Sequence, residues 1–231
     1  MVDLDSSKII KSINQIYDEL NIIPHLRMHM FRAAAIGEII AENWSTKSFA
    51  IHKDDIIAAL LLHDIGNIAK FNFDEPLFWH GHDSEYIEYW KGIKRETIEK
   101  YGTQSDYAIT AKMAEGLGIS ERAIFLISNM GFTKIDSMMQ SDDFDLKICT
   151  YADQRVGPLS VVSISERLED LRRRYGKENG WKDESGLRLE RQIFENVSIT
   201  PLTITESAVQ KYIHRYMDQK SGPAGKITGL R

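Results

Sequence analysis

Residues 56–64 read Ile-Ile-Ala-Ala-Leu-Leu-Leu-His-Asp, so an unbroken apolar run leads directly into the doublet His63-Asp64. A helix this apolar is expected to be buried. A buried carboxylate beside an imidazole is costly unless a hydrogen-bond network or a cation offsets the desolvation. Gly66 follows, which places the doublet near a helix C-terminus, where the negative end of the helix dipole favours a cation. The stretch therefore predicts a buried helix that delivers two metal ligands to the floor of a cleft.

The composition is that of an ordinary globular protein, with 42% apolar and 27% charged residues in a chain of 231. The net charge of −5 argues against a broad surface for long nucleic acid. No apolar run approaches the roughly 20 residues of a membrane span, and the first residues lack a secretory signal pattern. The single cysteine, Cys149, excludes an internal disulfide and a cysteine-based zinc cluster. We therefore expect a cytoplasmic protein without a membrane partner.

Helical signals are dense along the chain, whereas strand-type alternation is scarce. Helix-capping residues, apolar stripes of helical spacing and terminating glycines mark the expected elements, which include capping-box patterns at Ser163–Glu166 and Thr203–Glu206. The expected helices cover residues 7–20, 24–43, 54–64, 105–113, 120–130, 144–156, 163–175, 187–197 and 203–218. The aromatic stretch 70–83 is expected to pack against another part of the protein. Residues 176–186 are expected to form an exposed connection. These patterns predict one compact all-α, multi-helix domain over residues 1–220, followed by a disordered tail at 221–231.

Two further helices carry side chains that suit the doublet. His29 lies on an apolar helix rich in small residues, with Arg32 one turn along on the same face. Asp153 lies near the end of a mostly buried helix, with Arg155 close by. Together with His63-Asp64 they offer two imidazoles and two carboxylates, which suit one divalent ion: Mn²⁺, Fe²⁺, Co²⁺, Ni²⁺ or Zn²⁺, with Mg²⁺ also compatible. Such an ion would retain positions for water or a substrate oxygen.

The order of these residues resembles the HD-domain superfamily of metal-dependent phosphohydrolases. The resemblance covers about residues 20–160. It is carried by His29-Met30-Phe31-Arg32-Ala33-Ala34, by His63-Asp64-Ile65-Gly66-Asn67 and by Tyr151-Ala152-Asp153. It implies an HD-domain-like helical bundle, His29, His63, Asp64 and Asp153 as metal ligands, and hydrolysis of a phosphoester through a metal-bound water. The implied partner is a small phosphorylated substrate such as a nucleotide, and a homodimer is compatible with exposed aromatic residues.

The resemblance also implies supporting roles, and the sequence departs from the family pattern at two places. The implied phosphate contacts are Arg32, Lys70 and Arg155. The candidates for acid, base or ligand support are His80, His82, Asp83 and Asn67. Asn67 replaces the lysine of the family signature, and residues 105–131 lack the histidines of binuclear members. A single metal ion is therefore favoured, with no organic cofactor, although His80 and His82 could serve a second ion.

Simpler interpretations stay open beside this one. His29 could be a hydrogen-bonded core histidine, His63-Asp64 a buried structural pair, and Asp153 a partner in a helix-end ion pair. Arg32 and Arg155 could pair with the acids rather than with substrate. At the level of function, the alternatives are a non-catalytic regulatory module that binds metal or nucleotide, and a phosphodiesterase.

Overall fold

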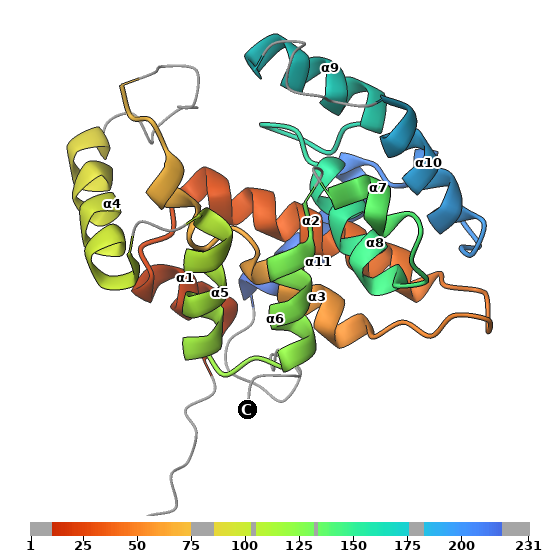
Figure 1. Cartoon of the computed structure of the whole chain (residues 1–231), viewed down its shortest axis with the longest axis horizontal. Coiled ribbons are helices and arrows are strands. Elements are labelled where there is room, and N and C mark those ends of the chain that lie inside the picture. Colours follow the sequence, from red (N-terminus) through yellow and green to blue (C-terminus); the bar gives the residue numbers. More distant parts are fainter. Residues whose placement is uncertain (1–10, 75–85, 103–104, 132–133, 176–182, 219–231) are drawn as a thin grey trace, which may run out of the picture.

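The computed structural model describes residues 11–74, 86–102, 105–131, 134–175 and 183–218. Within these ranges the chain forms α-helices, short 3-10 helices and isolated β-bridges but no β-strand, which confirms the all-α prediction (Figure 1). The elements are α1 (Ile13–Glu19), α2 (Pro24–Glu42), α3 (Lys53–Leu62), η1 (Asn67–Lys70), α4 (Ile87–Tyr101), α5 (Asp106–Gly116), α6 (Glu121–Asn129), α7 (Ile135–Met138), α8 (Phe144–Gln154), α9 (Ile164–Tyr175), α10 (Asp183–Phe194), η6 (Pro201–Thr203) and α11 (Glu206–Asp218).

Helices α2, α3 and α8 all contact one another and form the centre of the molecule. α2 runs across the middle of the view in Figure 1 and packs against α3, α8 and α11, while α3 also contacts α6 and α8. Small residues on α2 permit this close approach: a side chain at Gly37 would collide with Leu60 of α3, and Ala33, Ala34 and Ala35 are fully buried. The apolar run of α3 is buried between these neighbours, as its sequence predicts.

Helix starts agree with the sequence predictions at four places. Pro24 occupies the first turn of α2, and the hydroxyls of Ser105 and Ser120 cap α5 and α6. Ser163 and Glu166 form the predicted capping box at the start of α9, each side chain accepting from the other residue's backbone N–H.

The capping box predicted at Thr203 is wrong. The hydroxyl of Thr205 accepts from the N–H of Ala208, so the cap of α11 lies two residues later. Thr203 belongs to η6, and its hydroxyl donates to the carbonyl of Thr200. The carboxylate of Glu206, which a capping box would fold back, instead contacts residues far away in the sequence.

Other elements, among them the short helix α7, also differ from the prediction. α4 was not expected, because only Trp90, Ile93 and Thr97 of its residues are buried and its apolar stripe is therefore thin. α10 begins at Asp183, so residues 183–186 are helical rather than part of the expected connection. The predicted tail at 221–231 and most of the aromatic stretch 70–83 lie outside the described residues.

The buried apolar side chains form one continuous cluster that extends from Ile13 in α1 to Tyr216 in α11. Four polar contacts fix α11 along α2: the carboxylate of Glu38 accepts from Arg215 and Tyr216, that of Glu42 accepts from Tyr212, and Arg32 pairs with the first residue of α11. No helix in the described ranges is both long and apolar enough to cross a membrane.

The turn after the doublet packs directly on α5. The N–H of Gly66 donates to the hydroxyl of Thr110 at 3.1 Å. A Cβ at Gly66 would lie 2.7 Å from both the backbone nitrogen and the hydroxyl oxygen of Thr110. Only glycine fits here, because the obstacle is helix backbone that cannot rotate away.

We expect Gly66→Ala to lower the free energy of unfolding by about 1–3 kcal/mol, because the methyl group must push α5 away from the turn. Gly116→Ala is the matched control, since a Cβ there meets nothing within 4 Å. The control should be neutral, or stabilising by up to about 1 kcal/mol through helix propensity. Urea denaturation measures both variants, and equal effects would contradict the packing argument.

Candidate metal centre

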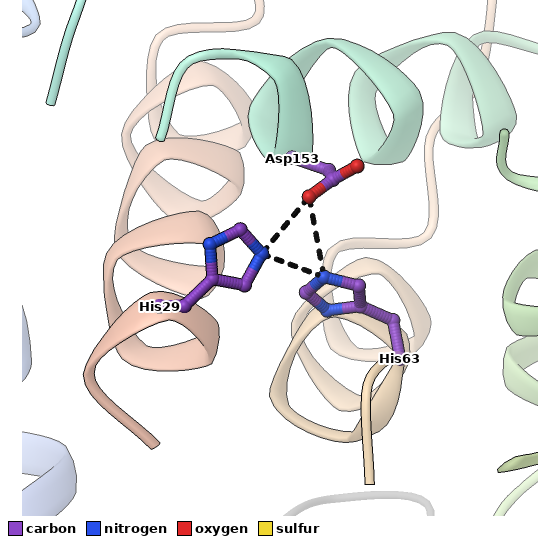
Figure 2. Close-up of side chains that lie close together, drawn as sticks. All are labelled: His29, His63 and Asp153. Atoms are coloured by element: carbon purple, nitrogen blue, oxygen red, sulfur yellow. Dashed lines mark hydrogen bonds and ion pairs between the residues drawn. The ribbon is translucent and has the colours of Figure 1, made fainter. Parts of the chain in front are cut away.

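Three side chains from the three central helices meet at one point (Figure 2). His29 comes from α2, His63 is the C-cap of α3, and Asp153 lies in the last turn of α8. The His29 Nε2 atom lies 3.2 Å from His63 Nε2 and 2.9 Å from Asp153 Oδ1. The remaining side of the triangle, from His63 Nε2 to Asp153 Oδ1, is 3.4 Å. The structure therefore brings together three of the four predicted metal ligands.

Asp64 extends the triangle to a fourth group. Its Oδ2 atom lies 3.5 Å from His29 Nε2 and 3.7 Å from His63 Nε2. Ligands about 2.0–2.2 Å from one ion are separated by roughly 3.0–3.5 Å at octahedral or tetrahedral angles. The observed spacings lie in that range or just outside it. The donor atoms of His29, His63 and Asp153 are close enough together to share an ion, whereas Asp64 lies beside this group.

The tautomer of His63 is fixed by its surroundings. Its Nδ1 atom lies 2.8 Å from the carbonyl oxygen of Leu60, which can only accept, so Nδ1 carries a hydrogen. In the neutral ring the lone pair is therefore on Nε2, the atom that faces His29 and Asp153. A backbone partner for the distal ring nitrogen is the usual arrangement of a metal-ligating histidine.

Gln154 holds the second oxygen of Asp153. Its amide Nε2 donates to Asp153 Oδ2 at 3.1 Å, which leaves Oδ1 for the cluster. Gln154 is only 7% exposed. No role is predicted for Gln154 from the sequence. The available signal was a glutamine in the last turn of a buried helix, where a polar side chain needs a partner.

The cluster concentrates negative potential. Burial disfavours the protonated imidazole of His63, but the carboxylates of Asp64 and Asp153 outweigh it and raise the pKa to about 9. Burial also penalises the carboxylate of Asp153, yet hydrogen bonds from His29 and His63 hold its pKa well below its usual range. The C-terminal ends of α3 and α8 add their negative dipole ends. Each effect favours a positive charge among these side chains.

The arginines predicted to contact phosphate have protein partners. The Nε atom of Arg32 donates to both carboxylate oxygens of Glu206, at 3.0 and 3.1 Å. Arg155 is 5% exposed, and it donates to the carbonyls of Val162 and Ile204 and to the hydroxyl of Tyr151. These contacts favour structural roles: Arg32 joins α2 to α11, and Arg155 joins the chain after α8 to the segment before α11.

Lys70 is placed differently. Its ammonium pairs with Asp106 at 2.8 Å, while 51% of its side chain stays exposed. Burial lowers the pKa of Lys70, but Asp64 and Asp106 outweigh it and raise the pKa above the ordinary value. Lys70 therefore stays protonated, interacts electrostatically with Asp64 and is accessible to a ligand.

The other predicted site residues fall into two groups. Asn67 is buried at the start of η1, directly after the turn that follows the doublet. His80, His82 and Asp83 lie outside the described residues, so their predicted roles stay predictions. Asn129 donates to the carbonyl of Phe125 and accepts from Lys134.

One residue near the site was missed by sequence reasoning. Tyr107 lies in the first turn of α5, next to Asp106. Burial raises the pKa of its phenol, and the charge of Asp153 raises it further. Nothing in the local sequence marks Tyr107, because its proximity to the cluster depends on how α5 packs against the turn at Gly66.

Comparisons of the chain with protein-family models, with curated proteins and with solved structures found no match.

If Gln154 orients Asp153, Gln154→Leu should weaken binding of Mn²⁺ or Zn²⁺ about 10-fold, the usual effect of removing a group that supports a ligand. Competition with a chromophoric chelator measures the affinity. Gln140→Leu, at an exposed position, is the control and should bind as the unmodified chain does. An unchanged affinity in Gln154→Leu would refute the orienting role.

The raised pKa of His63 has a consequence for the ion-free protein. Because the folded pKa exceeds the ordinary value of 6.5, protonation stabilises the fold fully below pH 6.5. This contribution is lost as the pH rises from 6.5 through about 9. We expect the free energy of unfolding of chelator-treated protein to fall across that window. His63→Asn should lack this fall, whereas the exposed control His214→Asn should keep it. Urea denaturation at several pH values measures the difference, and identical slopes would contradict the assignment.

Proposed function

We propose that this protein is a metal-dependent phosphohydrolase of HD-domain type that acts on a small phosphomonoester. The observation that carries the proposal is the convergence of His29, His63 and Asp153, with Asp64 beside them, at spacings that suit one divalent ion. The order of these residues along the chain supports it, because the same order is typical of that superfamily. A mixed set of imidazole and carboxylate ligands suits a transition-metal ion.

The ion would be held by His29, His63, Asp64 and Asp153. A divalent ion in such a site acts as a Lewis acid and lowers the pKa of bound water. The residues of the chain supply orientation: the carbonyl of Leu60 fixes the ring of His63, and the amide of Gln154 fixes Asp153. Both hold the donor atoms in place before any ligand arrives, which is what preorganised sites require.

Lys70 is the favoured phosphate contact among the described residues. Its exposed ammonium feels the carboxylate of Asp64 and can form a charge-assisted hydrogen bond to a phosphate oxygen. The Asp106 carboxylate holds the ammonium in position through its 2.8 Å contact. We leave Arg32 and Arg155 out of the proposed phosphate site, because Glu206 and backbone carbonyls already engage their guanidinium groups.

Two other functions fit part of the same evidence. A regulatory module that binds metal or nucleotide without turnover would need the same ligands, and Asn67 in place of a charged residue favours it. A phosphodiesterase would also use a metal-bound water. A substrate panel of monoesters and diesters, combined with binding measurements, separates the three functions.

We expect protein reloaded with Mn²⁺, Co²⁺, Ni²⁺ or Zn²⁺ after chelation to hydrolyse phosphomonoesters, and Asp153→Ala to lose at least about 100-fold in rate. Asp142→Ala, an exposed acid near the start of α8, is the matched control and should keep full activity. Lys70→Met should raise KM more than it lowers kcat, whereas Lys47→Met should change neither. Tight metal binding without turnover of any ester would favour the regulatory module, and faster turnover of diesters would favour the phosphodiesterase.

A further inference from the structure

A groove of about 490 Å³ opens between the start of α5 and the end of α6. Its α5 side includes Tyr107, Ala108 and Ala111, and its other side includes Met130 and Lys134. Most of these side chains offer carbon atoms, and Tyr107 is 45% exposed. The volume lies within the range of roughly 300–1,000 Å³ that is typical of small-molecule sites.

The start of α5 links the groove to the lysine that we assign to phosphate. Thr110 of α5 holds the N–H of Gly66, two residues after Asp64. Tyr107 precedes Thr110 by one helical turn and so lies on the same face of α5. Asp106, its neighbour in sequence, holds Lys70, the cation that we assign to phosphate. Tyr107 therefore lines the groove, while the residue before it positions Lys70.

The walls of the groove are held in place. A Cβ at Gly131 would lie 3.2 Å from the hydroxyl oxygen of Tyr107, so the phenol end of the ring rests against that glycine. The ammonium of Lys134 donates to the carbonyl of Ser128 and the side-chain oxygen of Asn129. These contacts hold an aromatic ring and a cation in the lining of the groove.

We propose that this groove binds the aromatic or heteroaromatic ring of the phosphoester whose phosphate lies at the metal centre. The proposal rests on the proposed function, which places the phosphate beside Asp64 and Lys70. A planar ring can stack on Tyr107 and contact the methyl groups of Ala108 and Ala111 and the thioether of Met130. The phenol of Tyr107 also feels the charge of Asp153.

The test compares two monoesters with the same leaving group, a nucleoside 5′-monophosphate and ribose 5-phosphate. Both esters leave through the 5′ oxygen of ribose, and they differ at C1′, where only the nucleotide carries the base. The ratio of their kcat/KM values therefore measures binding of the base in the groove and not the chemical step. We expect the metal-loaded protein to prefer the nucleotide about 10-fold or more, the usual effect of stacking one base. Ala111→Trp, which fills the groove, and Tyr107→Ala should each lower that ratio about 10-fold. Phe125→Ala is the matched control: Phe125 is also 45% exposed and lies on α6, and its loss should leave the ratio unchanged.

A binding arm separates this proposal from the proposed function. The probe is the unphosphorylated nucleoside, measured by ligand-observed NMR on the full chain, with thermal unfolding as the check that each variant is folded. Ring binding that Ala111→Trp abolishes, without hydrolysis of any ester, would support the groove and overturn the hydrolase. Equal turnover of both monoesters, unaffected by either variant, would overturn the groove and leave the hydrolase standing. The absence of both binding and turnover would overturn both.

Discussion

The site depends on one electrostatic constraint: two imidazoles and two carboxylates face one another where α2, α3 and α8 meet. The nitrogen atoms of His29 and His63 lie 3.2 Å apart, and two lone pairs cannot face each other at that distance, so a hydrogen or a cation must lie between or beside them. In the ion-free chain a bound proton meets this requirement, as the raised pKa of His63 indicates. A divalent ion would meet it as well, because the donor atoms of His29, His63 and Asp153 lie close enough together to bind it at once.

The surrounding fold maintains this constraint. Small residues on α2 let α3 approach closely, and glycine after the doublet lets α5 seat against the turn. The C-terminal helix α11 contacts α2 at several points along its length, from Arg32 to Glu42. Apolar packing and polar contacts therefore act on the same three helices, so the ligand positions follow from the core and not from flexible loops.

Features that depend on local periodicity could be predicted from the sequence. The apolar run before His63-Asp64 predicted a buried helix, and helical context placed His29 and Asp153 as its partners. Long-range pairing could not be read in this way. Arg32 and its partner Glu206 are 174 residues apart. The partner of Lys70, Asp106, lies on α5, and the position of this helix depends on tertiary packing. Glu206 looked like part of a capping box because the local pattern was right, but a distant arginine competes for its carboxylate.

The hydrogen-bonded pair His29–Asp153 joins positions 124 residues apart in the chain. Such a contact forms late, since the entropy of closing a long loop must first be offset by the docking of the intervening helices. No fragment of the chain that omits α2 or α8 contains all four donor side chains. Uptake of an ion by these four side chains would therefore report that α2, α3 and α8 have all reached their places, which makes occupancy of the site a measure of completed folding.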